Sequence, residues 1–267
     1  MVLDVHLYFC VVSHGHAELL AEALPPLAQQ DFLRVCVVDN LGQPQLRELC
    51  AGLDLVYLQP GPKPLGFGAN NNRGFAYWAE HGMGDEDYFV CCNPDVFIQP
   101  SMLAVLHEQL ATLQPRLAAI NLFSDAGMSR PDFSIRHFPR IGDYLAKRSE
   151  IGNPAVIDKR TINTALLCDW AAGSFLLFRC DLYRQVGGFD ERYFMYFEDV
   201  DICLRARREA NERVLYLPQV TAVHKGAFKN RTVFSWHFYW YLTGMLKYFL
   251  RYYAGGGVVR VSSESQQ

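Results

Sequence analysis

The first half of the chain alternates apolar runs with longer amphipathic stretches. Apolar residues at helical spacing predict helices at residues 17–27, 68–81 and 100–113. Strands that alternate with helices predict an α/β fold with a mostly parallel central sheet flanked by helices. Continuous apolar or β-branched runs predict the buried strands, at residues 5–12, 32–38, 53–58, 88–92 and 117–123.

The second half of the chain follows a different pattern. Residues 124–163 mix charges with prolines and contain few apolar runs, which predicts an irregular excursion that covers an active site. A strand-like run at 170–178 follows, and a helix is expected to begin near Glu198. We divide the chain into a main domain, 1–232, and a C-terminal amphipathic helix with a flexible tail, 233–267.

The composition of the 267 residues is that of a globular protein, with half of them hydrophobic and a fifth charged. The net charge of −3 argues against a nucleic-acid-binding protein, whose binding face is strongly basic. The charge is unevenly spread, because residues 213–263 contain seven Lys and Arg and no acidic residue. This asymmetry indicates an anionic partner other than nucleic acid for the C-terminal part.

The eight cysteines have no fixed spacing, and none belongs to a Cys-x-x-Cys pair. We therefore expect reduced core thiols in a cytosolic protein, rather than disulfides or a zinc site. Asp4 and His6 interrupt the first apolar run, which is unlike a signal peptide. No stretch has the ~18 uninterrupted apolar residues that a membrane-spanning helix needs.

Polar residues follow three of the predicted strands, at 13–16, 39–40 and 93–95. Ligands of parallel sheets gather at the carboxyl ends of the strands, so we expect a nucleotide there. Asn93-Pro94-Asp95 by itself is most simply a turn. The alternative is a cation site, because one carboxylate together with phosphate oxygens is enough to bind Mg²⁺.

An acidic motif supplies a second candidate. The aromatic stretch 193–197 leads directly into Glu198, Asp199 and Asp201. Carboxylates favour the positive end of a helix dipole, which explains one or two of the three. Aromatic walls around a carboxylate exclude water and adjust its basicity, so the motif also favours a general base.

Two further segments are ambiguous by themselves. His224 follows an apolar run, and a lone histidine is usually structural unless the fold brings it beside Asp95. Residues 66–74, with the sequence GFGANNNRG, lack the lysine and the spacing of a P-loop. We interpret them as a close approach of the backbone to a ligand at a helix start, with asparagines that bind a base or ribose.

Taken in order, these motifs resemble family 2 of the inverting, nucleotide-sugar-dependent glycosyltransferases, which have the GT-A fold. The resemblance covers about residues 3–225. Its pieces are VVSHGH, VDN, GFGANNNRG, NPD, WAAGS, the motif of residues 188–205 and His224. Within the family, they are most similar to bacterial rhamnosyltransferases of O-antigen and cell-wall polysaccharide synthesis.

The resemblance implies roles for individual residues. Asp199 occupies the position of the catalytic base, and Asp95 and His224 those of ligands to Mg²⁺ or Mn²⁺. Asn93 stands where the metal motif of the family, Asp-x-Asp, has its first Asp. Trp170, Gly173 and Glu198 would border the donor sugar and the acceptor, with Asp39 at the pyrimidine base of the donor. The whole set expected at the nucleotide is Ser13, His14, Gly15, Asp39, Gly66, Phe67, Asn71 and Asn72.

The implied reaction moves L-rhamnose from dTDP-L-rhamnose to N-acetylglucosamine on a polyprenyl diphosphate, with inversion at the anomeric carbon. Asp199 removes the proton of the acceptor hydroxyl, and the metal ion stabilises the leaving diphosphate. Alternatives on the same scaffold are a UDP-sugar donor and a non-catalytic nucleotide-sugar-binding subunit. A nucleotidyltransferase is disfavoured, because residues 13–16 lack the glycine-rich, basic loop of that class.

Residues 233–253 contain ten aromatic side chains, and two interpretations of this helix stand. It is either a helix of the core or of a homodimer, or a helix in the membrane interface, where Trp and Tyr prefer to lie. In the second case Lys247 and Arg251 would meet anionic headgroups or the acceptor diphosphate. We expect a cytoplasmic protein, peripheral on the inner face of the cell membrane. Further basic residues nearby are Lys225, Lys229 and Arg231.

Overall fold

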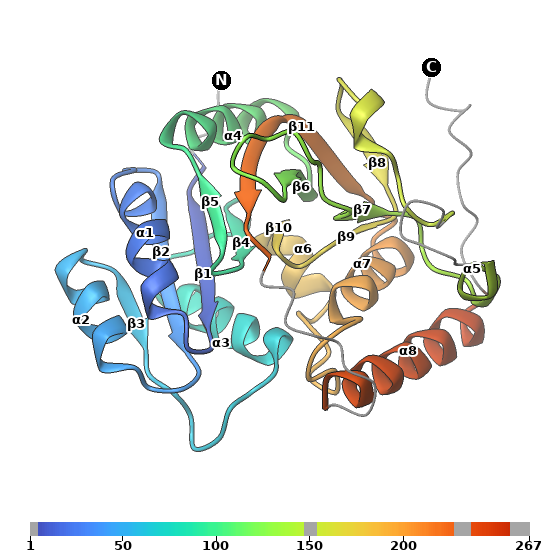
Figure 1. Cartoon of the computed structure of the whole chain (residues 1–267), viewed down its shortest axis with the longest axis horizontal. Coiled ribbons are helices and arrows are strands. Elements are labelled where there is room, and N and C mark those ends of the chain that lie inside the picture. Colours follow the sequence, from blue (N-terminus) through green and yellow to red (C-terminus); the bar gives the residue numbers. More distant parts are fainter. Residues whose placement is uncertain (1–4, 147–153, 227–235, 257–267) are drawn as a thin grey trace.

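A central β-sheet with helices on both faces organises the protein in the computed structural model, which describes residues 5–146, 154–226 and 236–256 (Figure 1). The strands of this sheet are β1 (Leu7–Ser13), β2 (Leu33–Asp39), β3 (Val56–Leu58), β4 (Tyr88–Cys92), β5 (Val96–Ile98), β6 (Leu117–Phe123), β8 (Leu166–Cys168), β10 (Phe175–Arg179) and β11 (Val214–His224). The helices are α1 (Ala17–Ala28), α2 (Pro44–Gly52), α3 (Phe67–Glu80), α4 (Pro100–Leu113), α5 (Ile141–Ala146), α6 (Cys180–Gln185), α7 (Glu198–Glu209) and α8 (Trp236–Ala254), with a 3₁₀ turn η1 (Lys159–Thr161). A separate two-stranded sheet consists of β7 (Ile135–Arg136) and β9 (Trp170–Ala171).

The main sheet joins the two halves of the chain. Its order is β3-β2-β1-β4-β10-β6-β11-β5, and β8 pairs with β11. Strand β1 runs parallel to β2 and β4, and β6 runs parallel to β11, whereas β10 lies antiparallel between β4 and β6. The carboxyl ends of β1, β2 and β4 therefore meet at one edge, and the predicted α/β class is confirmed.

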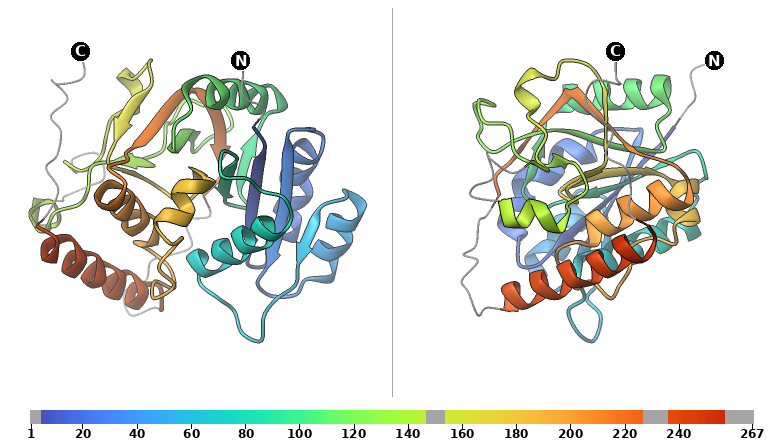
Figure 2. Two further views of the ribbon diagram at one scale, coloured as in Figure 1. Left: turned by 180° about the vertical axis from the view of Figure 1, so that it is seen from behind. Right: turned by 90° about the vertical axis from the view of Figure 1, so that its right-hand side faces the viewer.

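Each face of the sheet has its own apolar core, because side chains alternate along a strand. Leu7, Phe9 and Val11 of β1 lie on the face that α1, α2 and α4 cover. Tyr8 and Cys10 lie on the face covered by α3, α6, α7 and α8. Figure 2 shows both layers, with α8 outermost beside α7. All eight cysteines are buried and free, which confirms core thiols rather than disulfides.

One predicted strand is wrong. The run 170–178 is divided, because its first two residues form β9 against β7 and its end forms β10 in the main sheet. The break is held by the Ala172 N–H, which donates to Ser134 O (2.8 Å). At residues 172–174 the chain therefore passes from the small sheet into the main sheet, and this turn becomes part of the candidate site.

Helix α8 packs on α7 through its inner face. Tyr248 and Tyr252 are buried there, and Arg208 of α7 donates to the carbonyl oxygen of Arg251 (2.8 Å). Arg251 Nη1 in turn lies 2.5 and 2.7 Å from the two carboxylate oxygens of Asp201 in α7. The inner face of α8 therefore belongs to the core of the protein, as one of the two interpretations predicts.

The outer face of α8 is exposed and apolar. We call this face the outer stripe, and its side chains are between 46% and 72% exposed. None of the described helices is long and apolar enough to cross a membrane. The expected domain boundary at residue 232 lies outside the described residues. The members of the outer stripe are Trp236, Tyr239, Leu242, Leu246, Leu250 and Tyr253.

The basic residues near α8 bind to the protein itself. Besides Asp201, Arg251 pairs with Asp190 (2.8 Å), and its contact with anionic headgroups stays a prediction. Lys225 pairs with Glu22 (3.0 Å), and Lys247 donates to a backbone carbonyl oxygen. The other two basic residues, 229 and 231, lie outside the described residues.

Candidate functional site

The carboxyl ends of β1 and β2 form one side of the candidate site. The Asn40 N–H donates to Ser13 O (2.9 Å), and the Asn40 amide nitrogen lies 3.3 Å from His14 Nδ1. Ser13 is buried and its Oγ accepts the His16 N–H (3.2 Å), whereas His14 is exposed. Gly15 turns the chain with a φ of 83°. The structure therefore brings Ser13, His14 and Gly15 to the predicted edge, and their contact with a nucleotide stays a prediction.

Asp39 is fully buried at the end of β2, where its carboxylate shapes the loop that follows. The carboxylate oxygens accept the backbone N–H groups of Leu41, Gly42 and Gln43 at 2.6–3.0 Å and the hydroxyl of Tyr57 at 2.9 Å. Four donors on one carboxylate give Asp39 a structural role in this loop. Its predicted contact with a pyrimidine base stays a prediction.

Gly66 and Phe67, at the start of α3, lie against another segment of the chain. A Cβ atom on Gly66 would clash with the backbone of Phe194, and the Phe67 N–H donates to Phe194 O (3.1 Å). The ring of Phe67 also packs edge-on against Phe189 (5.8 Å between ring centres). The absence of a side chain at Gly66 therefore lets the start of α3 pack against the segment before α7. Contacts of both residues with a nucleotide stay predictions.

The two asparagines of α3 have different surroundings. Asn72 donates to Phe189 O (2.9 Å) and Glu191 Oε1 (3.0 Å), and its own oxygen accepts the Tyr183 hydroxyl (2.7 Å). Asn71 is buried, and its Oδ1 has no hydrogen-bond partner within the described part of the chain. Asn71 therefore keeps an acceptor for a ligand, whereas Asn72 fastens the turn before α7. Their contacts with a base or ribose stay predictions.

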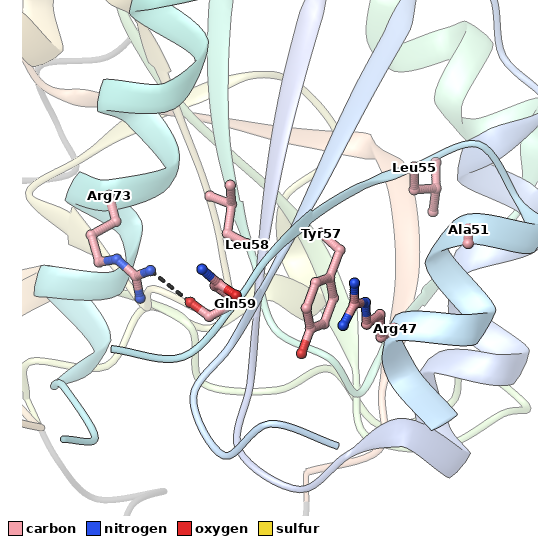
Figure 3. Close-up of a pocket in the computed structure, with 7 residues that line it drawn as sticks. All are labelled: Arg47, Ala51, Leu55, Tyr57, Leu58, Gln59 and Arg73. Atoms are coloured by element: carbon pink, nitrogen blue, oxygen red, sulfur yellow. Dashed lines mark hydrogen bonds between the residues drawn. The ribbon is translucent and has the colours of Figure 1, made fainter. Parts of the chain in front are cut away.

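An open cavity of about 490 Å³ lies around β3, next to this edge (Figure 3). Tyr57 connects it to the site, because its hydroxyl donates to Asp39. Arg73 of α3 donates to Gln59 O across the cavity (2.9 Å). None of the residues predicted to bind nucleotide or metal or to act as the base lines this cavity, and the hydrogen bond from Tyr57 to Asp39 is its link to them. Its lining residues are Arg47, Ala51, Leu55, Tyr57, Leu58, Gln59 and Arg73.

Asp95 and His224 lie side by side although they are far apart in the sequence. His224 ends β11 and is in register with Val96 of β5, the residue after Asp95. The Lys225 N–H donates to Asp95 O (3.0 Å), and His224 Nε2 lies 3.4 Å from Asp95 Oδ1. The condition for treating His224 as a candidate metal ligand is therefore met. A carboxylate and an imidazole, with phosphate oxygens of a substrate, are suitable donors for Mg²⁺ or Mn²⁺.

A second carboxylate faces the other ring nitrogen of His224. Asp132 Oδ2 lies 3.7 Å from His224 Nδ1. Burial alone would lower the pKa of His224, but the contacts with Asp132 and Asp95 outweigh burial and raise this pKa to about 9. Within the described residues, no group of three or more His, Cys, Asp or Glu side chains is placed to hold a metal ion. Oxygens of a bound diphosphate would therefore have to complete the coordination.

The start of α7 has an unusual backbone conformation. Tyr196 and Phe197 have left-handed φ angles of 71° and 70°. Such angles are costly for residues other than glycine and cluster at functional sites. Helix α8 covers this segment closely, because a Cβ atom on Gly244 would lie 2.7 Å from Tyr196 O. The backbone that leads into the acidic motif is therefore held between α3 and α8.

Asp199, the second residue of α7, has a fixed carboxylate. Its Oδ2 accepts the N–H of Gly173 (3.1 Å), and its Oδ1 accepts the N–H of Val200 (2.8 Å). Asp199 keeps part of its surface exposed, unlike Glu198 beside it, which is buried. An oriented and accessible carboxylate of this kind is suited to receive a proton from a ligand.

The surroundings of the two neighbouring carboxyl groups act on their charges to different extents. Burial and the charge of Asp199 raise the pKa of Glu198 well above its ordinary value. Burial also raises the pKa of Asp199, but the N–H groups of Gly173 and Val200 and the charge of Arg136 oppose this rise. The surroundings therefore disfavour a charge on Glu198 more strongly than a charge on Asp199.

The turn at Gly173 and Ser174 joins the two centres. Ser174 O accepts the N–H of Asn93 (2.9 Å), two residues before Asp95, while the Gly173 N–H donates to Asp199. The turn therefore connects the carboxylate of Asp199 to the backbone of the segment that carries Asp95, through one hydrogen bond on each side.

Trp170 lies next to this turn. Its indole N–H donates to His137 O (3.0 Å), and the guanidinium of Arg136 lies 5.6 Å from the ring centre. Arg136 and Asp132 are functional candidates that the sequence did not reveal. Both lie in the irregular excursion, where no periodic pattern or motif distinguishes one charged residue from another.

Comparison with known proteins identifies the family. No family model matches the chain. The chain is 35% identical over 249 residues to rhamnosyltransferase WbbL of Escherichia coli K12, a match that covers 91% of this chain and 92% of that protein. The chain belongs to the family 2 glycosyltransferases. The resemblance to this family, which rested on the ordered motifs of the sequence, is therefore confirmed.

Two further proteins are similar to this glycosyltransferase. It is 33% identical over 190 residues to N-acetylglucosaminyl-diphospho-decaprenol L-rhamnosyltransferase of Mycobacterium tuberculosis, which covers 64% of this chain and 59% of that protein. Among solved structures, the mannosyltransferase PcManGT from Pyrobaculum calidifontis, in complex with GDP-Man and Mn²⁺, has a TM-score of 0.53 at 18% identity and covers 84% of this chain and 58% of that one. This likeness shows the fold alone, which is the GT-A fold predicted from the sequence.

Proposed function

We propose that this glycosyltransferase transfers L-rhamnose from dTDP-L-rhamnose to N-acetylglucosamine carried on a polyprenyl diphosphate. The similarity to a rhamnosyltransferase along nine-tenths of the chain carries this proposal. The name of the mycobacterial relative specifies rhamnosyl transfer with an N-acetylglucosaminyl-diphospho-decaprenol, which supports the acceptor. The nucleotide of the donor is inferred from the resemblance of the sequence motifs.

Asp199 acts as the general base in this proposal. It accepts the proton of the acceptor hydroxyl while the hydroxyl oxygen attacks the anomeric carbon of rhamnose. The new C–O bond forms on one face of the sugar as the bond to the diphosphate oxygen breaks on the other, so a β-linked donor yields an α-rhamnoside. The N–H groups of Gly173 and Val200 keep the carboxylate oriented, and the raised pKa of Glu198 disfavours a like charge beside it.

A divalent metal ion, Mg²⁺ or Mn²⁺, fits the donors that Asp95 and His224 present to each other. When bound, it supplies Lewis-acid stabilisation of the leaving diphosphate. Mn²⁺ accompanies GDP-Man in the complex of PcManGT, a protein of the same fold.

Asp95→Ala is expected to weaken dTDP binding in the presence of Mn²⁺ and to leave it unchanged in the presence of EDTA. His224→Ala should show the same defect to a smaller extent. Equal dTDP affinities with Mn²⁺ present would contradict the metal role.

A transfer assay tests the function itself. The protein is incubated with dTDP-L-rhamnose and a synthetic lipid-linked N-acetylglucosamine diphosphate, and the product is identified by mass and by the NMR signal of its anomeric proton. We expect an α-rhamnosylated lipid, and no product with UDP-glucose or UDP-N-acetylglucosamine. Transfer from a UDP-sugar alone would overturn the donor assignment. Binding of dTDP-L-rhamnose without turnover of any donor would identify a nucleotide-sugar-binding subunit instead.

The lipid of the proposed acceptor places the reaction at a membrane surface, on the inner face of the cell membrane. The outer stripe of α8 offers an apolar face with Trp236, Tyr239 and Tyr253, residue types that favour the interface. Arg251 ties the same helix to α7, the helix that carries Asp199. Because Arg251 and Lys225 pair with the protein's own carboxylates, we expect the binding to depend on apolar contact more than on anionic lipid.

Liposome flotation tests this placement. Removal of α8 is unsuitable, because Tyr248 and Tyr252 belong to the core. We expect wild type to float and a variant with Leu242, Leu246 and Leu250 all changed to Ser to stay in solution. The matched control changes three exposed leucines elsewhere, Leu41, Leu113 and Leu167, and should float like wild type. If wild type never floats and light scattering reports a dimer that the α8 variant abolishes, the outer stripe is a homodimer interface.

A further inference from the structure

The irregular excursion contains a buried lysine that has no role in the site described so far. Lys159 belongs to η1, and its side chain is 1% exposed. Its three partners are Leu122 O at 3.3 Å, Ser134 Oγ at 2.8 Å and the carboxylate of Asp132. An ammonium group that is removed from water and surrounded by three acceptors holds those acceptors in fixed positions.

Asp132 connects this lysine to the metal-binding side of the site. One carboxylate oxygen, Oδ1, contacts Lys159 and accepts the N–H of Ser134 (3.0 Å). The other oxygen, Oδ2, lies 3.7 Å from His224 Nδ1. Since His224 Nε2 faces Asp95 at 3.4 Å, the imidazole ring stands between two carboxylates, one at each nitrogen.

The sheet explains why these distant residues meet. His224 in β11 is opposite Val96 in β5, which brings Asp95 to one side of it. On the other side, Val223 of β11 is opposite Phe123 of β6, and Phe123 pairs with Pro131 of the excursion. Asp95, His224 and Asp132 therefore belong to four neighbouring segments, in the order β5, β11, β6 and the excursion, and the Asp132 N–H donates to Leu122 O (2.9 Å) in β6.

Asp132 is not placed to be a direct metal ligand. A cation bound by Asp95 and His224 Nε2 would be separated from Asp132 by the width of the imidazole ring. Among the described residues, no cluster of three such side chains could hold a metal ion, in agreement with this separation. Histidine ligands usually donate their second N–H to a carboxylate, which sets the tautomer and the ring orientation.

We propose that Asp132 and Lys159 are positioning residues for the metal ion: Asp132 orients His224 so that Nε2 faces the metal ion, and Lys159 holds Asp132. This inference rests on the metal role proposed above for Asp95 and His224. It assigns a function to the irregular excursion, which supplies both residues and thereby links its folding to metal affinity.

The test measures the affinity of the full-length protein for Mn²⁺, in the presence of dTDP, by electron paramagnetic resonance of the free ion. Asp132→Asn, which keeps the size of the side chain, should weaken Mn²⁺ binding about 10–100-fold, the range found for partners of metal-binding histidines. Lys159→Met should weaken it in the same direction. The control is Asp158→Asn, which removes an exposed ion pair with Arg160 next to η1 and should bind Mn²⁺ like wild type.

A double-mutant cycle separates positioning from a general loss of structure. In a His224→Ala background, Asp132→Asn should cause no further loss of Mn²⁺ affinity, because it acts through the imidazole. An equal loss with and without His224 overturns the proposal, and so does an affinity within twofold of wild type in Asp132→Asn. If Lys159→Met does not fold, as judged by circular dichroism, the result for Asp132→Asn decides.

The controls also distinguish this proposal from the one on which it rests. If Asp95→Ala and His224→Ala bind Mn²⁺ as wild type does, the metal site is wrong and the positioning role is overturned with it. If both weaken binding while Asp132→Asn does not, the metal site stands and only the positioning role is overturned.

Discussion

The two sides of the site are held together in different ways. On the nucleotide side, Asp39 binds the backbone of the three residues at 41–43, and Asn40 binds the nearby chain at Leu65. On the reacting side, Asp199 accepts the N–H of Gly173, and Arg251 forms an ion pair with Asp201, which joins α8 to α7. Hydrogen bonds to neutral groups shape the loop after β2 on the first side, whereas an ion pair between two helices also shapes the second.

This difference shows which side of the site depends on a buried ion pair. A buried charge is destabilising unless its partner is in place, so each pair on the reacting side forms only when the whole domain has folded. The loops of the nucleotide side depend on a few neighbouring residues and are therefore separable from the rest. Substitutions should be local in effect on the first side and should affect distant segments on the second.

The largest effect is expected at the base. Asp199→Asn should reduce the rate of transfer ~10²–10⁴-fold, the usual contribution of a general base. The free energy of unfolding should change little, because the amide oxygen can still accept one of the two N–H groups, and removal of a partly buried charge offsets the loss of the other. Steady-state kinetics and urea denaturation of one preparation measure both quantities. More than a tenth of the wild-type rate in the variant would show that another group removes the proton.

The next effect concerns the contact between α8 and α7. Arg251→Met should lower the free energy of unfolding by about 2 kcal/mol, less than the ~3–5 kcal/mol typical of a broken buried pair, because Arg205 still pairs with Asp201. Arg192→Met is the matched control, since Arg192 is 71% exposed and pairs with Asp190 alone. It should cost less than about 1 kcal/mol. Equal losses of unfolding free energy in the two variants would contradict the expectation that the buried ion pair stabilises this protein more than the exposed one.

A pH profile examines the two carboxyl groups. Transfer requires ionised Asp199, and burial raises the pKa of this group, so kcat/KM should be full at high pH and fall about tenfold per unit as the pH drops below that pKa. The acidic limb should lie above the ordinary range of aspartate. Glu198→Gln should leave the acidic limb of the kcat/KM profile nearly unchanged, because the raised pKa of Glu198 favours its neutral form. A shift of the limb by a full pH unit toward acid in this variant would mean that Glu198 carries charge beside the base.

The smallest effect is expected on the nucleotide side. Asp39→Asn should cost about 1 kcal/mol of stability, because the single oxygen of the amide can replace only some of the four accepted hydrogen bonds. Hydrogen exchange should show faster opening at residues 41–43 and no change at α7 or β11. Faster exchange in α7 as well would contradict the local character assigned to this side.

The alternation of strands and helices in the first half was predictable because periodicity reflects burial there. Asp199, Asp95 and His224 were recognisable from the ordered motifs, and the structure added that His224 lies beside Asp95. Asp132 and Lys159 were not predictable, because their importance depends on partners brought together by β6 and β11, which leaves no mark in the local sequence.

The break of the strand at 172–174 and the two left-handed residues before α7 were also beyond the sequence. An apolar run is continuous in sequence even where its chain changes sheets, so residues 170–178 looked like one strand. Positive φ angles are expected at glycine or asparagine, whereas Tyr196 and Phe197 adopt them because α3 and α8 hold the segment from both sides. Tertiary contacts overrode local preference at both places.

The close contact between Gly244 and Tyr196 limits which C-terminal helices of related enzymes could replace α8 in a chimeric protein. A chimera that kept residues 1–226 and took its last helix from another glycosyltransferase would need a glycine at the position of Gly244 and an arginine at that of Arg251. With any larger residue at the first position, the incoming helix would be displaced from the segment that carries Tyr196 and Phe197. Exchange of the C-terminal helix would then also disturb the segment that leads into Asp199, so α8 and this segment have to be transferred together.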